Sequence, residues 1–368
     1  MIYKKLIFSF LFLVCIQLSY SQYFDDLKRY VDENYSGSAR YNSMGGAFGS
    51  LGGEFSSISD NPASGAVFNY TQIGFSLKLN DEKNSVLYNN RNSTKESNDF
   101  DFNQFGVVFV LNNNSNYWSK LNFSFNYQLQ NIYNNKFSVK GSSNIGIDNY
   151  FLNYAQGLDL SNLKLNDNET ISGLYQFLGS SPNLGFGAQQ AFLGYQGYIV
   201  NPFSNTNDNN NYLTNAKYSN NLNQELYLNS SGDNKKSSFN VSGFYKNNLY
   251  VGLNINSYEI NYSETRDFYE DNYDFESNLR SLQFRNNLKT FGKGTSIQIG
   301  IIALLKNNFR LGISYHSPIW YKFFEESSQY LITSHKIDEI FYEDTVDPNT
   351  INVYPEYKLK IPSKLSGS

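Results

Sequence analysis

The feature that most constrains how this chain can fold is a strict alternation of apolar and polar residues in several short stretches. The clearest one, Leu121 to Gln130, reads LNFSFNYQLQ, with apolar or aromatic residues at odd positions and Asn, Ser or Gln at even positions. A period of two residues is the period of a β-strand. The same alternation recurs at 251–256, 296–301 and 309–316. The sequence therefore predicts an all-β fold.

This alternation is compatible with two environments. In a soluble sandwich the apolar face of a strand meets a protein core, whereas in a membrane barrel it meets lipid and the polar face lines the lumen. The polar faces here carry small or amide side chains. We assign Arg310, Lys358 and Lys360 to the lumen face, because Arg or Lys facing lipid at the membrane midplane costs about 2–4 kcal/mol.

The lengths of the connections favour the membrane barrel. Two short links, YKNNLY and LKNNFR, contain Asn247-Asn248 and Asn307-Asn308, and Asn tolerates the positive φ of tight turns. Eight strands are predicted, at 69–79, 102–111, 119–131, 239–246, 249–263, 294–306, 309–324 and 356–366. Long links alternate with the short ones, at 80–101, 132–238, 264–293 and 325–355. Short turns at one end and long extracellular loops at the other are typical of a transmembrane antiparallel β-barrel.

The first 21 residues have the composition of an export signal. Lys4 and Lys5 precede an apolar run from Leu6 to about Ile16, which is too short for the roughly 20 residues of a membrane-spanning helix. We therefore predict a signal peptide at 1–21 and location in the outer membrane of the cell. The only cysteine, Cys15, lies inside this segment, so no disulfide is expected in the exported chain.

Composition argues against several classes of function. The net charge of −4 comes with no basic stripe, so we expect no nucleic-acid partner. The chain has two histidines, and we expect no metal site and no cofactor. A barrel enzyme of the lipase type, using His316 or His335, and an adhesive or structural barrel are two functions open to such a chain. His316 shares parity with Arg310 on the predicted lumen face, so we expect no catalytic residues and no enzyme.

A glycine-rich run, MGGAFGSLGGEFSSISDNPAS, begins at Met44. It matches neither of the glycine patterns that cradle phosphate, and no lysine follows it. The run, with Gly45 and Gly46 near its start, ends at Asn61-Pro62-Ala63, which favours a turn over a helix. The sequence predicts a compact coil of small residues.

This run with its NPA, together with YQLQNIYNNKFSVKG and SIQIGIIALLKNNFRLGISYHSP, resembles the FadL family of outer-membrane transporters for long-chain fatty acids and other hydrophobic compounds, including toluene. The resemblance implies a barrel of fourteen strands whose N-terminal segment, here 22–68, forms a plug, or hatch, in the lumen. It also implies a monomer that contacts outer-membrane lipid, the barrel-assembly machinery and a hydrophobic small-molecule solute. Asn61, Pro62 and Ala63 would either only direct the chain into the first strand or also take part in rearranging the plug.

The chain departs from that family in length. An eight-stranded barrel has an interior that side chains fill, which leaves no room for a plug. We therefore interpret residues 69–368 as an incomplete barrel, truncated at its C-terminal side and lacking about six strands.

Two features suggest a path for the solute. Val108 and Val110 lie on the face where polar lumen residues are expected, so they either pack against the plug, which we favour, or line a hydrophobic path, and both could hold. Alternation fails at Asn131, Ile132, Tyr133, Asn134 and Asn135, where the family has an inward kink that opens a lateral gate. The loop 140–238 has helical apolar spacing at 150–158 and 171–178, and it either caps the outer mouth as a landing site or only shields it.

Overall fold

The computed structural model describes residues 24–31, 36–113, 117–305 and 309–368. The chain forms two compact units, residues 1–34 and 35–368. The predicted signal peptide, residues 1–21, and the turn at Asn307-Asn308 lie outside the described residues. In the first unit the described residues form helix α2 (Phe24–Val31), and every other element belongs to the second unit. No helix among the described residues combines the length and the apolar character needed to cross a membrane.

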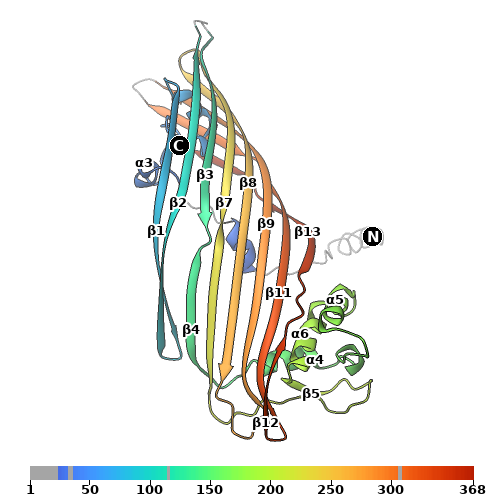
Figure 1. Cartoon of the computed structure of the whole chain (residues 1–368). Helices are drawn as coiled ribbons and strands as arrows, with labels where there is room; N and C mark the ends of the chain where they lie inside the picture. The colour runs from blue at the N-terminus through green and yellow to red at the C-terminus, as the bar shows by residue number, and fades with distance from the viewer. Residues whose placement is uncertain (1–23, 32–35, 114–116, 306–308) are drawn as a thin grey trace, which may run out of the picture. The chain divides into compact units, whose positions relative to one another are not determined.

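The second unit is built on one antiparallel sheet of twelve strands (Figure 1). Pairing follows the order β1-β2-β3-β7-β8-β9-β10-β14; β11 also pairs with β9, β4 pairs with β7, and β12 and β13 pair with β11. The strands of this sheet are β1 (Gln72–Tyr88), β2 (Arg91–Asn112), β3 (Trp118–Ile132), β4 (Asn135–Ser143), β7 (Leu222–Tyr245), β8 (Leu249–Asp271), β9 (Leu279–Leu304), β10 (Arg310–His316), β11 (Ile319–Ile337), β12 (Ile340–Val346), β13 (Asn352–Ile361) and β14 (Lys364–Gly367).

The strands are longer than predicted, and much of each predicted loop is strand. β1 and β2 run through the predicted loop 80–101 and meet in a turn at Asn89 and Asn90, whose φ values are 44° and 63°. β8, β9 and β11 likewise extend into the predicted loops 264–293 and 325–355. The predictions of long loops there, and of only eight strands, are therefore wrong.

The missed extensions carry polar side chains on both faces. Residues 91–99 of β2, for example, read RNSTKESND, and all are exposed or half-buried. A strand with no apolar face has no hydropathy signal of period two, so its sequence looks like a loop.

Two predicted strands are interrupted. The single strand predicted at 356–366 is wrong, because β13 ends at Ile361 and β14 begins at Lys364. β10 ends at His316 and β11 begins at Ile319, so the single strand predicted at 309–324 is wrong. Pro318 lies in this gap and has no N–H to give to a strand ladder.

The turn between β7 and β8 is present, with positive φ at Lys246 and Asn247, one residue earlier than predicted.

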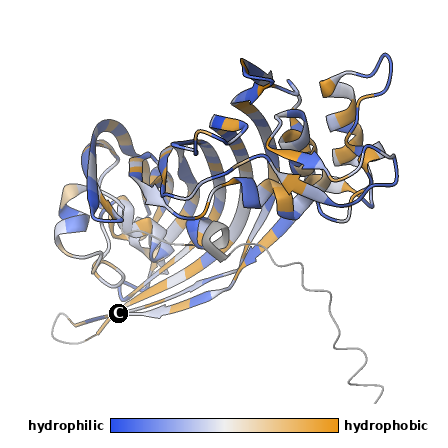
Figure 2. Cartoon of the chain, turned by 90° about the horizontal axis from the view of Figure 1, so that it is seen from below, coloured by the Kyte–Doolittle hydropathy of each residue, from blue (hydrophilic) through white to orange (hydrophobic). Residues whose placement is uncertain are grey.

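Strand pairing does not close the sheet in the part of the chain that is described. β1 pairs only with β2, and neither β13 nor β14 pairs with it. The sheet is nevertheless curved, as the view along the strands in Figure 2 shows. The barrel predicted from the sequence is thus seen as one large, curved antiparallel sheet.

The predicted loop 132–238 is largely ordered secondary structure. It holds β4 and the start of β7, and between them lie α4 (Asp148–Ala155), α5 (Ile171–Ser180), α6 (Gly185–Gln196), the 3₁₀ helix η3 (Leu160–Asn162) and the hairpin of β5 (Val200–Pro202) with β6 (Tyr212–Thr214). We call residues 144–221 the helical insert. Its Phe151 and Phe192 share a buried cluster with Leu282 and Phe284 of β9 and with Leu331 of β11.

Residues 36–68, which we call the N-terminal segment, pack on the same face of the sheet as the helical insert. The segment contains α3 (Ala39–Ser43) and the 3₁₀ helices η1 (Ser56–Ser59) and η2 (Pro62–Val67). It contacts Gln298 of β9, which has the same parity as Phe284. We call the face on which the N-terminal segment and the helical insert pack the inner face, and the opposite one the outer face. The half of the sheet nearer the turn 246–248 is the turn-side half, which includes 292–304 of β9, and the other is the far half.

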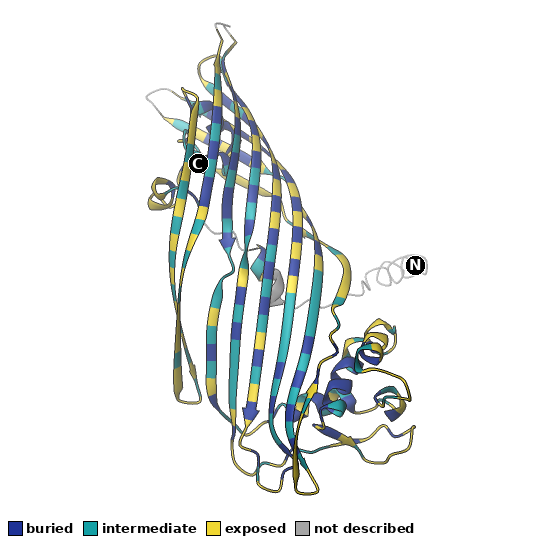
Figure 3. Cartoon of the chain, in the orientation of Figure 1, coloured by how far each residue is buried: buried dark blue, intermediate teal, exposed yellow. Residues whose placement is uncertain are grey.

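In the turn-side half, buried and exposed residues alternate along the strands (Figure 3), and the polarity of the two faces is the reverse of that in a soluble protein. Ile297, Ile299 and Ile301 on the outer face are 41–49% exposed, whereas Ser296 and Gln298 on the inner face are 2% and 3% exposed. The same assignment holds for the predicted alternating stretches at 121–126 and 253–256. The predicted parities of these stretches are therefore confirmed.

Candidate functional site

The candidate site is the contact between the N-terminal segment and the inner face of the turn-side half. Glycines of two neighbouring strands make room for Asn61 and Pro62. A methyl group at Gly252 of β8 would overlap the Pro62 carbonyl, and one at Gly300 of β9 would overlap the Asn61 side chain. The backbone of the segment thus approaches the sheet more closely than any larger residue would permit.

Amide side chains of the sheet hold the segment by its main chain. Asn103 donates to the backbone carbonyl of Gly37 at 2.6 Å, and Gln128 donates to that of Ser36. Four other amides donate to backbone carbonyls of residues 58–65. The pairs are Asn122 to Gly65 at 2.7 Å, Asn240 to Pro62 at 2.9 Å, Asn254 to Ile58 at 2.7 Å, and Gln298 to Ser59 at 3.0 Å and Asp60 at 2.9 Å. An irregular coil cannot satisfy its own buried carbonyls. These amides therefore donate the hydrogen bonds that backbone N–H groups would donate in a helix or a sheet.

Asn61 fixes the local turn and also reaches the sheet. Its Oδ1 accepts from the Ala63 N–H at 3.0 Å and so caps η2, with Pro62 at the first helical position. Its Nδ2 donates to the carbonyls of Gly49 at 2.8 Å and Ile301 at 3.2 Å. The Asn61-Pro62-Ala63 turn therefore contacts both the N-terminal segment and the sheet. Its part in rearranging the plug stays a prediction.

Gly45 and Gly46 serve the backbone conformation. Their φ values are 59° and 73°, a region that favours glycine. A methyl group on Gly45 would meet nothing within 4 Å, so tight packing does not explain this residue.

Val108 and Val110 lie against the N-terminal segment. Val108 is fully buried in a cluster with Ile58 and Phe68, and Phe55 and Val110 pack against this cluster. This is the packing that the sequence favoured, and the hydrophobic path stays a prediction.

The irregularity predicted at Asn131 to Asn135 is present. β3 ends at Ile132 and β4 begins at Asn135, and both strands pair with β7. The Tyr133 N–H donates to the Gly232 carbonyl at 2.9 Å, and the Gly232 N–H donates to the Asn134 side chain at 3.2 Å. The break is thus attached to β7, whereas its function as a lateral gate stays a prediction.

Beside this break, a backbone ladder is missing between two strands. β2 pairs with β3 only from Gln104 to Asn112, and β4, which follows β3, pairs with β7 and with no other described strand. Side chains connect β4 to the β1–β2 hairpin instead, as in the hydrogen bond from Asn84 to Asn135 at 2.8 Å. Side-chain hydrogen bonds of this kind can break and re-form while every backbone hydrogen bond of the sheet stays in place.

Between the N-terminal segment and the helical insert, the inner face is aromatic. Tyr321 and Phe323 of β11 lie over Gly294 and Gly292 of the neighbouring β9. Their rings stack at 5.4 Å, and Tyr258 of β8 lies 5.8 Å from Tyr321. This aromatic surface was not predicted, because it depends on which glycine lies opposite which ring in the register.

The two histidines occupy different surroundings. His316 Nε2 lies 2.8 Å from Ser296 Oγ and 3.2 Å from the Tyr258 hydroxyl. Asn256 donates to the same Ser296 oxygen at 3.1 Å. His335 stacks on Tyr198 at 4.4 Å, and burial holds its pKa below the usual range. Among the described residues no three His, Cys, Asp or Glu side chains are grouped as a metal would require.

A buried carboxylate connects the helical insert to the far half of the sheet. Glu270 of β8 is 1% exposed and accepts from the Ile147 N–H at 3.1 Å and from Gln224 at 2.6 Å. Burial raises the pKa of Glu270 above its usual value, although these hydrogen bonds oppose the shift. Glu270 fixes the start of α4 to the sheet.

No family model matches this chain, and no curated protein or solved structure matches it. The resemblance to the FadL family is carried by the sequence segments named above and stays a prediction.

Proposed function

We propose that this chain is part of an outer-membrane transporter of the FadL type, for passive uptake of long-chain fatty acids or other hydrophobic small molecules. The curved sheet would form part of the barrel wall, the N-terminal segment its hatch, and the helical insert its extracellular cap. The turn 246–248 would face the periplasm.

The observation that carries this proposal is the reversed polarity of the turn-side half. Phe239, Ile255 and Ile299 expose 49–61% of their surface on the outer face, whereas Asn240, Asn254 and Asn256 are at most 2% exposed on the inner face. Water on the outer face would favour the opposite arrangement, and lipid favours this one.

The missing ladder beside β4 supports a sideways exit for the solute. A hydrophobic molecule that leaves through the wall enters the membrane without crossing water. The Asn84–Asn135 hydrogen bond is one of the contacts that such an exit would break.

Uptake by cells that produce the full-length protein tests the proposal. We expect labelled fatty acid or toluene to enter these cells faster than cells without the protein. Equal uptake of every hydrophobic solute tested would contradict transport.

A reversible cross-link tests the hatch. Ser59 Oγ donates to the Gln128 side chain at 2.8 Å, so cysteines at these two positions can be joined by a short bifunctional thiol reagent. We expect the cross-link to slow uptake and its reduction to restore it. Each single cysteine variant, treated in the same way, is the control, and unchanged uptake in the cross-linked protein would exclude a mobile hatch.

A lipase-like enzyme is the second candidate, favoured by the 2.8 Å contact between Ser296 and His316. Ester hydrolysis by the purified protein that is lost in Ser296→Ala would support it. Transport remains the first proposal, because Ser296 is 2% exposed and shares its hydroxyl with Asn256.

A further inference from the structure

A row of lysines crosses three neighbouring strands on the outer face. Lys293 of β9 lies directly opposite Lys322 of β11, which lies directly opposite Lys358 of β13. All three side chains are exposed. Lys360 is also exposed and faces Trp320 in the adjacent row. The sequence-based assignment of Lys358 and Lys360 to the inner face is wrong, because directly paired residues share a face and Lys322 points away from the buried Tyr321.

Acidic neighbours neutralise this lysine row only in part. Glu356 lies 3.2 Å from Lys322, and Glu259 of β8 lies opposite Lys293 in the register. In the part of the chain described, Lys293, Lys358 and Lys360 make no ion pair. Like charges directly opposite each other on a sheet are destabilising. The row is therefore expected to bind a negative partner.

The lysine row lies at one boundary of the apolar band. From Lys293 to Leu304, the end of β9, the strand advances eleven residues. That is about 37 Å along the strand, or about 26–30 Å along the membrane normal at the usual strand tilt of 35–45°. The apolar band of an outer-membrane barrel is about 25 Å tall, so the row is one membrane thickness from the turn end.

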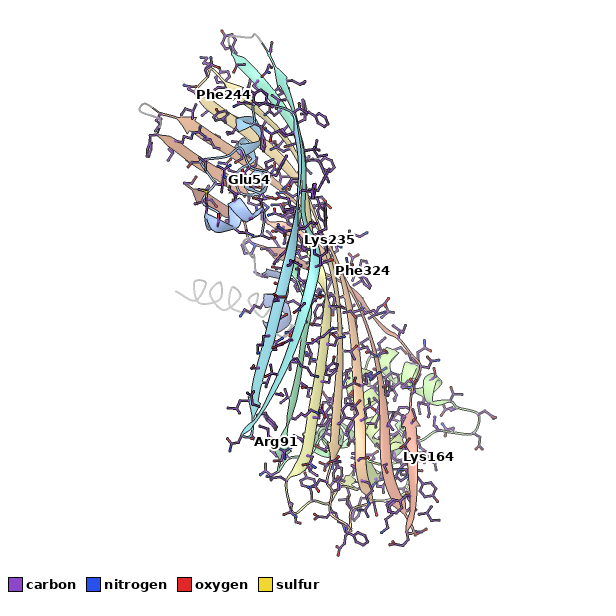
Figure 4. All side chains as sticks on the ribbon, turned by 60° about the vertical axis from the view of Figure 1, so that its left-hand side comes forward. Glu54, Arg91, Lys164, Lys235, Phe244 and Phe324 are labelled. Carbon is purple, nitrogen blue, oxygen red and sulfur yellow. The ribbon has the colours of Figure 1, made fainter. Side chains whose placement is uncertain are left out.

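Aromatic side chains flank the lysine row on the outer face. Trp320 lies on its turn side, and Phe324 with Phe291 lies on its far side, each between 44% and 49% exposed. Phe324 and Lys235 are both labelled midway along the strands in Figure 4, between Phe244 at the turn end and Arg91 at the far end. Aromatic girdles of this kind mark the level of lipid headgroups.

We propose that Lys293, Lys322 and Lys358 bind the phosphate groups of the glycolipid in the outer leaflet, lipid A. This inference rests on the proposed membrane location, in which the turn 246–248 faces the periplasm and the row therefore meets the outer leaflet. Each ammonium group donates hydrogen bonds to phosphate oxygens. The negative charge of the phosphate offsets the repulsion between lysines that lie opposite each other.

The test is lipid A binding by the purified full-length protein in detergent, measured by native mass spectrometry. We expect the variant K293Q/K322Q/K358Q to bind lipid A on the order of a hundredfold more weakly than the wild type. The matched control is K83Q/K95Q/K140Q, which removes three exposed lysines elsewhere and should change the affinity by less than about threefold. If both triple variants bind equally well, the proposal is wrong.

Two further arms identify the ligand and guard against misfolding. Lipid A without its phosphates should bind the wild type weakly, and inorganic phosphate should not compete with lipid A; efficient competition would indicate a free phosphate site and overturn the lipid proposal. The single variant K293Q should bind on the order of fivefold more weakly, which keeps the test decisive if the triple variant fails to fold.

Failure of this proposal can be distinguished from failure of the proposed function. Wild-type protein that does not extract with outer membranes or show a heat-modifiable folded form would contradict both. Protein that inserts and transports, but whose lysine variants keep full lipid A affinity, would contradict the lysine row alone.

Discussion

Strands β7, β8 and β9 run through both the turn-side half and the far half of the sheet, and the two halves place opposite chemistry on each face. In β9 the inner face changes from Ser296 and Gln298 near the turn to Leu282 and Phe284 in the far half. The outer face changes from isoleucines to Arg285 and Lys289. The backbone of β9 is continuous through both halves, so its geometry does not explain the change in residue type. The change follows from the environment that each face contacts.

On the inner face the covering is visible in the contacts. The turn-side half meets the carbonyl groups of an irregular coil, and it presents amides that donate to them. The far half meets the apolar sides of helices, and it presents Leu and Phe. The outer face should follow the same rule, with lipid on one half and water on the other.

The largest expected effect is the loss of packing under the helical insert. Phe284→Ala should destabilise the docked insert by about 3–5 kcal/mol, because the ring is 4% exposed and lies 5.2 Å from that of Phe151. Hydrogen exchange in α4 and α6 measures this loss. The matched change Phe291→Ala, at an exposed ring on the outer face of the same strand, should have little effect, and equal effects would contradict the assigned faces.

A charge on the outer face should distinguish the two halves next most strongly. Ile255→Arg should lower the stability of the membrane-inserted protein by about 2–4 kcal/mol, whereas Ser263→Arg, eight residues along the same face of β8, should have little effect. Urea unfolding in lipid vesicles gives both values. Similar losses of stability at the two positions would show that both contact lipid, which would contradict the boundary placed between them.

Removal of one amide from the inner face should loosen the N-terminal segment. Gln298→Ala leaves the carbonyls of Ser59 and Asp60 without this donor, which should cost about 1–3 kcal/mol. Faster hydrogen exchange at residues 57–64 would reveal it. Gln283→Ala, on the outer face of the far half, should leave exchange in this segment unchanged.

The smallest expected effect concerns pH. Burial lowers the pKa of His335, so the folded protein binds fewer protons than the unfolded chain near the usual histidine pKa of about 6.5. The contribution of His335 to stability is therefore present above that pH and is lost as the pH falls through the lowered value, although Asp344, 3.5 Å away, opposes the shift.

Hydrogen exchange in α6, corrected for intrinsic rates, should reveal this loss because His335 stacks on Tyr198 next to that helix. We expect faster exchange at pH 5.5 than at pH 7.5 in the wild type and a weaker dependence in His335→Gln. An unchanged dependence in the variant would assign the effect to another group.

The sequence predicted the parts of the fold where one face is apolar. Alternation located the turn-side strands and their faces, and helical spacing located α4 and α5. It missed α6, because residues 188–194 of that helix are all buried, including Gln189 and Gln190, so its polar residues do not alternate with apolar ones at a helical period. It also missed the polar strand extensions and assigned Lys358 to the wrong face, which only its pairing with Lys322 decides.

For the candidate site, the sequence located the segment but not its partners. The glycine run and Asn61-Pro62-Ala63 identified the coil, and Val108 suggested its contact. Gly252 and Gly300, which the coil touches, are separated from it by about two hundred residues or more in the sequence. No local pattern contains that contact, because it follows from strand register.

Recognition through main-chain carbonyls also has an evolutionary consequence. Every residue type carries the same carbonyl, so Asn254 and Gln298 would bind Ile58 and Ser59 equally well after many substitutions in the coil. Side chains of the segment that do not touch the sheet are therefore free to drift, or to be redesigned for a different cargo, while the docking frame stays constant. Selection should instead concentrate on the amides and glycines of the sheet that hold the segment.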